Sequence, residues 1–153
     1  MLICDLSVLH KYGKLALDSE LKSLGFNWQE MVVMMVLERM PGADQTLLSK
    51  LLQTDKGNVT RLINQMEGKG LLLRQITKED SRRRAIHLTA QGEAHLLPLH
   101  QAMSNWEAAC LKGLSREQVS KFEETSALII SNILESTNSV QSFPCTAEER
   151  TVL

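Results

Sequence analysis

Aromatic residues and prolines are scarce in this 153-residue chain, which contains three Phe, two Trp, one Tyr and three Pro. So few prolines leave room for long helices, because proline removes a backbone donor and crowds the preceding turn. Cysteine is also rare, and its three occurrences are odd in number, far apart and without metal-ligand spacing: Cys4, Cys110 and Cys145. This usage argues against a disulfide framework and fits a reducing, cytoplasmic compartment. We therefore expect no metal and no cofactor.

A long hydrophobic run is missing as well. The longest apolar stretch covers residues 31–37, far fewer than the roughly 20 residues of a membrane span. Asp5 and His10 interrupt the apolar N-terminal stretch and no basic residue precedes it, so we expect neither a signal peptide nor a membrane partner. Paired carboxylates, a nucleophile beside a base and a phosphate loop are also missing, so we do not expect an enzyme.

Charge is nearly balanced overall but unevenly distributed. The net charge is −1, yet residues 44–89 carry nine basic and five acidic side chains, which leaves −5 on the remainder. A basic module on an acidic body indicates a polyanionic partner that contacts only the module.

The hydrophobic pattern predicts a mainly α-helical chain with one small β-hairpin, an α+β fold in a single domain. Residues 2–24 have apolar side chains at helical spacing, and Gly25 ends this helix. Asn27 with Glu30 is a capping-box pattern that begins a second helix. Its segment 31–37 is apolar all round, so we expect it to be buried.

Two short helices and a hairpin follow. Asp44 can cap the first helix, and Asp55 can cap the second by accepting the backbone N–H of Asn58. The second helix has one apolar stripe at i, i+3, i+4, i+7 spacing: Val59, Leu62, Ile63 and Met66. Residues 71–76 and 85–88 are predicted strands, joined by a polar loop.

A long helix is predicted from Thr89 to about Lys112, bent at Pro98. Its expected core positions are Leu96, Leu99, Met103, Trp106 and Cys110. Ser115 with Gln118 is a further capping box, which begins a helix that runs to about residue 136. We expect residues 137–153, which are rich in Ser, Thr and Asn, to form a tail.

The polar face of the second short helix carries groups that can read DNA. Its members are Lys56, Gly57, Asn58, Thr60, Arg61, Asn64 and Gln65. Arg61 can pair with guanine, and the amides can pair with adenine edges in a major groove. Gly57 allows close approach of the backbone, and Thr60 can bond a phosphate. Any surface helix has a polar face, so this feature alone leaves a solvated face equally possible.

The hairpin loop changes that balance. Arg82, Arg83 and Arg84 are consecutive and repel one another, which a narrow, electronegative minor groove would compensate. Asp80 can hold the Arg82 guanidinium by a charge-assisted hydrogen bond. A helix for the major groove beside a cationic hairpin for the minor groove predicts a reader of double-stranded DNA.

Four segments with consistent spacing resemble the MarR family of winged helix-turn-helix transcription regulators. These are GFNWQEMVVMMVL, LLSKLLQTDKGNVTRLINQMEGKGLLLR, DSRRR and LTAQG, and the resemblance spans residues 2–136. The family's Asp-x-Arg pair falls on Asp80 and Arg82. Gln53 departs from the pattern, because it stands in the inter-helix turn where glycine is frequent.

The resemblance implies a cytoplasmic homodimer that acts as a repressor on a pseudo-palindromic operator. Residues 1–40 and 89–136 would form the dimerisation region, residues 41–88 the winged helix-turn-helix lobe, and residues 137–153 a C-terminal tail. Four positions match groove-facing positions of the family: Lys56, Asn58, Thr60 and Arg61. Arg82 matches its minor-groove arginine.

Such regulators carry an effector pocket between the dimer helices and the DNA-binding lobe. Its candidate lining here is His10, Tyr12, Trp28, Met31 and Met35, with Trp106 as a further candidate, and it suits a small aromatic or amphipathic compound. For each of these residues, an ordinary core position is the favoured alternative. Two alternatives stay open: a redox sensor of the same fold that uses Cys4, and a winged-helix protein-interaction module without DNA binding.

Overall fold

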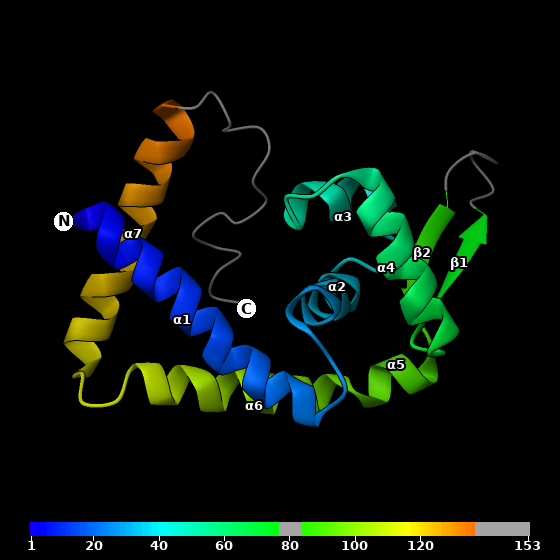
Figure 1. The fold of residues 1–153 in the computed structure, drawn as a ribbon, viewed down its shortest axis with the longest axis horizontal. Helices are drawn as coiled ribbons and strands as arrows, with labels where there is room; N and C mark the ends of the chain where they lie inside the picture. Colours follow the sequence, from blue (N-terminus) through cyan, green and yellow to red (C-terminus); the bar gives the residue numbers. More distant parts are fainter. Residues whose placement is uncertain (77–83, 137–153) are drawn as a thin grey trace. The chain divides into compact units, whose positions relative to one another are not determined.

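The computed structural model describes residues 1–76 and 84–136 (Figure 1). The chain divides into two compact units, Met1–Cys110 and Leu111–Leu153. The helices are α1 (Leu2–Ser23), α2 (Trp28–Arg39), α3 (Gln45–Leu51), α4 (Lys56–Gly68), α5 (Ala90–Ala94), α6 (Leu96–Cys110) and α7 (Arg116–Ser136), and the strands are β1 (Leu72–Ile76) and β2 (Arg84–Leu88). The α+β class predicted from the sequence is confirmed, since the described sheet is a single antiparallel pair, β1–β2.

Both predicted capping boxes are present. At the start of α2, Asn27 Oδ1 accepts the Glu30 N–H and Glu30 Oε2 accepts the Asn27 N–H, each at a distance of 3.0 Å. Ser115 Oγ accepts the Gln118 N–H at 3.2 Å and Gln118 Oε1 accepts the Ser115 N–H at 2.8 Å before α7. Each box satisfies two backbone donors that a helix N-terminus otherwise leaves free.

The core of the first unit is built around α2, whose apolar segment is buried as expected: Met31, Val33, Met34, Met35 and Leu37. Leu17 and Leu21 of α1 and the apolar stripe of α4 complete it from either side. Helix α1 packs along α6, where the Trp106 indole N–H donates to the Gly13 carbonyl over 3.0 Å (Figure 1). Trp106 is partly buried against the core through this contact.

The predicted continuous helix after Thr89 is interrupted at His95, which separates α5 from α6. Pro98 explains the position, because it lacks the N–H that would bond the carbonyl four residues earlier, at Ala94, and its ring crowds that carbonyl. The chain closes the gap with a tighter turn, in which the His95 N–H bonds to the Gly92 carbonyl at 2.9 Å. Expecting a mere bend was therefore wrong.

The expectation that Cys110 is a core residue was also wrong, because its side chain is exposed. Leu99 is buried and three neighbours pack partly against the core: Leu96, Met103 and Trp106. After Trp106 the last turn of α6 extends beyond this core, and residues 107–110 are all exposed.

Large apolar side chains are exposed on α1 between residues 2 and 15: Leu2, Ile3, Leu6, Val8, Leu9, Tyr12 and Leu15. In the second unit, α7 has no buried residue within the described structure, and Phe122, Leu128 and Ile133 are exposed. None of the helices in the described ranges is both long and apolar enough to cross a membrane.

Candidate DNA-binding interface

Helices α3 and α4 form a helix-turn-helix (Figure 1). Asp44 Oδ1 accepts the Leu47 N–H and Asp55 Oδ1 accepts the Asn58 N–H, each over 2.9 Å, as predicted for both caps. Gln53 in the turn between them has φ +49°, the left-handed backbone region that favours glycine. Glycine would adopt this conformation without steric cost, whereas glutamine accepts a modest strain here.

Helix α4 has one buried and one exposed face. The predicted apolar stripe is buried: Val59, Leu62, Ile63 and Met66. The predicted DNA-reading residues lie on the other face, where all are exposed except Thr60, which is half-buried. Exposure makes these side chains accessible, but their hydrogen bonds divide them into two groups along the helix.

The N-terminal half of α4 presents its cations freely. The Lys56 and Arg61 side chains are exposed and make no hydrogen bond or ion pair with any described residue. Thr60 Oγ1 donates to the Lys56 carbonyl at 2.8 Å and lies 3.3 Å from Gln45 Oε1 of α3. Asn58 Nδ2 bonds to Asp55 Oδ2 and, at 3.2 Å, to Thr54 Oγ1, so its amide must leave the cap before it can donate to a base.

The C-terminal half of α4 is held by the rest of the unit. Asn64 Oδ1 accepts a hydrogen bond from Arg74 Nη2 of β1, and Gln65 Nε2 donates to Glu30 Oε1 of α2 at 3.1 Å. From the sequence, both amides were expected to read adenine edges. In this structure their hydrogen bonds link α4 to β1 and α2.

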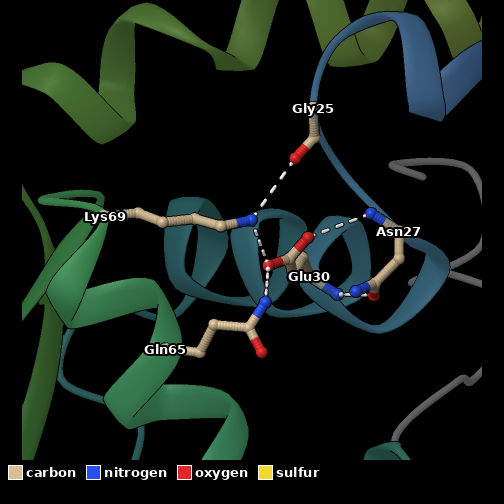
Figure 2. Close-up of polar contacts among 5 residues, drawn as sticks. All are labelled: Gly25, Asn27, Glu30, Gln65 and Lys69. Atoms are coloured by element: carbon tan, nitrogen blue, oxygen red, sulfur yellow. Dashed lines mark hydrogen bonds and ion pairs between the residues drawn. The ribbon is translucent and has the colours of Figure 1, made fainter.

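A buried carboxylate joins α2 to the end of α4 (Figure 2). The Glu30 side chain is 1% exposed, and Lys69 Nζ, just after α4, lies 2.6 Å from its Oε1. Lys69 Nζ also donates to the Gly25 carbonyl over 3.4 Å in the turn after α1. The sequence identified Glu30 only as a capping residue, because its partners are 35 and 39 residues away.

The β-hairpin lies directly after α4. Strands β1 and β2 pair in register from Leu72↔Leu88 to Ile76↔Arg84. The Gly42 N–H bonds to the Ile86 carbonyl and the Ile86 N–H bonds to the Ala43 carbonyl, so the turn before α3 lies along β2. Arg84 is exposed at the start of β2, whereas Asp80, Arg82 and Arg83 lie outside the described residues.

The base of the hairpin is fixed by the LTAQG segment. Thr89 Oγ1 donates to the Gly70 carbonyl at 2.6 Å and accepts the Gly92 N–H at 3.0 Å, which caps α5. A Cβ on Gly92 would lie 2.0 Å from the Leu71 carbonyl oxygen, so only glycine fits between α5 and β1. These contacts fix the position of the hairpin relative to α4.

The candidate effector residues do not share a surface in the described chain. His10 and Tyr12 are exposed on α1, Met31 and Met35 are buried in the core, and Trp28 is partly buried against it. A cavity of about 350 Å³ lies elsewhere in the first unit, lined by Leu37, Glu38, Pro41, His87, Leu88, Glu93 and Leu96. Cys4 is exposed, and the described residues contain no cluster of three or more His, Cys, Asp or Glu suited to a metal ion.

Two capped helices in a helix-turn-helix, followed by a two-stranded hairpin, define a winged helix-turn-helix fold. Residues 26–83 match the sequence model of the MarR family. This match confirms the resemblance to the MarR family that the sequence indicated.

Solved structures agree with the fold assignment. A MarR transcriptional regulator from Methanosarcina mazei is 23% identical with a TM-score of 0.79, over 88% of this chain and 96% of that one. A SlyA-like transcription regulator from Listeria monocytogenes is 18% identical with a TM-score of 0.77, over 93% and 95%. A mutant MarR from E. coli, solved in complex with operator DNA, is 21% identical with a TM-score of 0.74, over 81% and 89%.

Proposed function

We propose that the chain is a sequence-specific transcriptional regulator, a repressor that binds a pseudo-palindromic operator as a homodimer and is released by a small molecule. The observation that supports this most is the free, cationic N-terminal half of α4, presented by a helix-turn-helix beside a hairpin. The similarity in fold to a MarR that was solved with operator DNA points the same way. We place this regulator in the cytoplasm, where it would meet DNA. Its function would require no enzymatic activity.

Residue roles follow from what each side chain can reach. Arg61 would form a bidentate pair with a guanine in the major groove, because its guanidinium is exposed and unengaged. Lys56 and Thr60 would contact phosphates near the N-terminus of α4, where the helix dipole also favours anions. Gly57 allows the backbone to approach closely, and Asn58 would read a base after leaving its cap.

The hairpin residues would bind the adjacent minor groove. Arg82 would enter the groove with Asp80 orienting it, while Arg83 and Arg84 would contact phosphates. Arg84 is exposed at the start of β2, which suits this role. The other three roles rest on the sequence pattern.

A second copy of the chain would cover the exposed apolar side chains of α1 and α7. The dimerisation region would be residues 1–40 and 89–136, the DNA-binding lobe residues 41–88, and the tail residues 137–153. Large apolar side chains cost free energy in water, about 25 cal/mol per Å² of apolar surface. The homodimer would place two copies of α4 on half-sites about one helical turn apart.

A small aromatic or amphipathic effector would act between the dimer and DNA-binding regions. It would bind near His10, Tyr12, Trp28, Met31 and Met35 and favour a half-site spacing that the operator lacks. Because Met31 and Met35 are buried here, the effector would have to open the core or use surface that the second copy completes.

Duplex binding as a function of salt tests the proposal. The full chain should bind a random duplex library at low salt and lose affinity steeply as salt rises, because phosphate contacts release counterions. Selection from the same library should yield a pseudo-palindrome. If the protein binds no duplex at low salt, the interaction-module alternative gains and the regulator proposal fails. Release by peroxide, lost in Cys4→Ser, would favour the redox alternative over a small-molecule effector.

A further inference from the structure

Glu30 is the one charged side chain buried among residues 1–76 and 84–136. Burying a carboxylate costs free energy unless it is paired and hydrogen-bonded. Its role as a cap does not explain the burial, because one oxygen, Oε2, suffices to accept the Asn27 N–H. The other oxygen, Oε1, is therefore the informative one.

Oε1 of Glu30 accepts hydrogen bonds from two residues at the same end of α4 (Figure 2). Gln65 Nε2 donates over 3.1 Å from the last turns of the helix, and Lys69 Nζ donates over 2.6 Å from its C-cap. Lys69 also reaches the Gly25 carbonyl. The Glu30 carboxylate and its partner Lys69 thus join the start of α2, the end of α4 and the turn after α1.

Strand β1 restrains the same half of α4 independently. Arg74 Nη2 bonds to Asn64 Oδ1 and lies 3.7 Å from Glu67 Oε2, while the Arg74 N–H donates to Glu67 Oε1 over 3.3 Å. The Arg74 side chain is only 16% exposed. The C-terminal half of α4 is therefore fixed from two elements, whereas the side chains of Lys56 and Arg61 in the N-terminal half have no described partner.

We infer that Glu30 is a positioning residue for DNA recognition, and that Gln65 is an anchor of α4 rather than a base reader. The inference rests on the proposed function. Arg61 lies one helical turn, about 6 Å, before Gln65, so any tilt at the anchor displaces the reading side chains. Recognition groups must stay within about 0.5 Å of their productive geometry, which gives a buried, multiply bonded anchor a functional role.

Glu30→Gln in the full chain tests the inference. Glutamine keeps an oxygen for the Asn27 N–H, and Lys69, 39% exposed, can turn to water, so the variant should fold. Glu38→Gln is the matched control: it is on the same helix and its carboxylate pairs with His100 over 2.8 Å, away from α4. Binding is measured with duplexes selected from a random library, well below the unfolding temperature of each variant.

Glu30→Gln should lose about ten-fold in affinity for the selected duplex, in the range that coupling mutations produce. Base preference should relax at several positions of a half-site together. Non-specific binding and its salt dependence should not change, because phosphate contacts set them. A residue needed only for stability would lower the unfolding temperature without altering base preference, and Glu38→Gln should alter neither.

Gln65→Ala separates the anchor from a base reader. If Gln65 is an anchor, Gln65→Ala should weakly relax base preference at several positions and have little further effect in the Glu30→Gln background. If Gln65 reads a base, Gln65→Ala should relax base preference at one position only. The inference is overturned if Glu30→Gln keeps the affinity and preference of the wild type, or if Gln65→Ala affects a single position. Should Glu30→Gln not fold, Lys69→Met removes the same ion pair from its exposed side and is judged in the same way. A wild-type chain that binds no duplex instead overturns the proposed function.

Discussion

Lys69 Nζ lies 2.6 Å from Glu30 Oε1, so the C-cap of α4 is paired with a carboxylate buried at the start of α2. The pair links two elements that the chain separates by 39 residues. Its consequences can be measured both in stability and in DNA binding.

Glu30→Ala should lower the free energy of unfolding by about 2 kcal/mol, because it removes the acceptor of the Asn27 N–H and leaves Gln65 and Lys69 without their carboxylate partner. The figure is below that of a fully buried pair, since Lys69 is partly exposed. Urea unfolding followed by circular dichroism measures it. Glu38→Ala, which breaks a half-exposed pair with His100, should cost about 0.5 kcal/mol or less. Equal losses in the two variants would contradict the special role of Glu30.

Gly92→Ala should destabilise the fold by at least about 3 kcal/mol, because the new Cβ would lie 2.0 Å from the Leu71 carbonyl oxygen. Either α5 or the base of β1 has to move. Gly68→Ala is the matched control: its Cβ meets nothing within 4 Å, and alanine should be neutral or stabilise α4 by up to about 1 kcal/mol. Thermal unfolding of both variants checks this, and a stable Gly92→Ala would show that the contact yields easily.

Arg61→Ala should relax base preference at one position per half-site, with a loss of about 1–3 kcal/mol for the matched base pair. Arg83→Ala should instead weaken all duplexes alike, because a phosphate contact carries no sequence information. Selection from a random library, followed by titration of single-base variants, distinguishes the two. Identical patterns for both variants would refute this division of roles.

Lys56→Ala should reduce the slope of log affinity against log salt by about one unit, since one phosphate contact releases about one counterion. Arg82→Ala should also flatten the slope. Ile76→Ala, an exposed apolar residue on β1, serves as a control and should leave it unchanged. A salt slope in Lys56→Ala equal to that of the wild type would remove Lys56 from the interface.

Leu9→Asp should shift the protein from dimer towards monomer, because it places a charge among the exposed apolar side chains of α1. Ile76→Asp introduces the same charge at an exposed apolar site in the proposed DNA-binding lobe and should leave the dimer intact. Sedimentation velocity at several concentrations measures both. A Leu9→Asp protein that remains dimeric would mean that the interface does not include this part of α1.

Local features of the fold could be predicted from the sequence. The caps at Asn27, Asp44 and Asp55 use partners three residues away, so their geometry depends on the backbone of a single turn. The buried stripe of α4 follows from helical periodicity in the same way.

The errors arose where a residue's environment depends on other elements. Cys110 has the spacing of a core residue, but the last turn of α6 extends beyond the core that its earlier turns contact. Pro98 predicted a disturbance correctly, but a bend and a break have the same sequence signal. The outcome depended on whether the chain could close a tighter turn at His95.

The sequence by itself determined which side chains face outward from α4, because that follows from a period of 3.6 residues. Only the tertiary structure decided which of them are free to bind. Gln65 and Asn64 look like readers in the sequence, yet Glu30 and Arg74 engage them from α2 and β1. Hydrogen bonds between elements depend on how helices pack in three dimensions, and no local pattern records their partners.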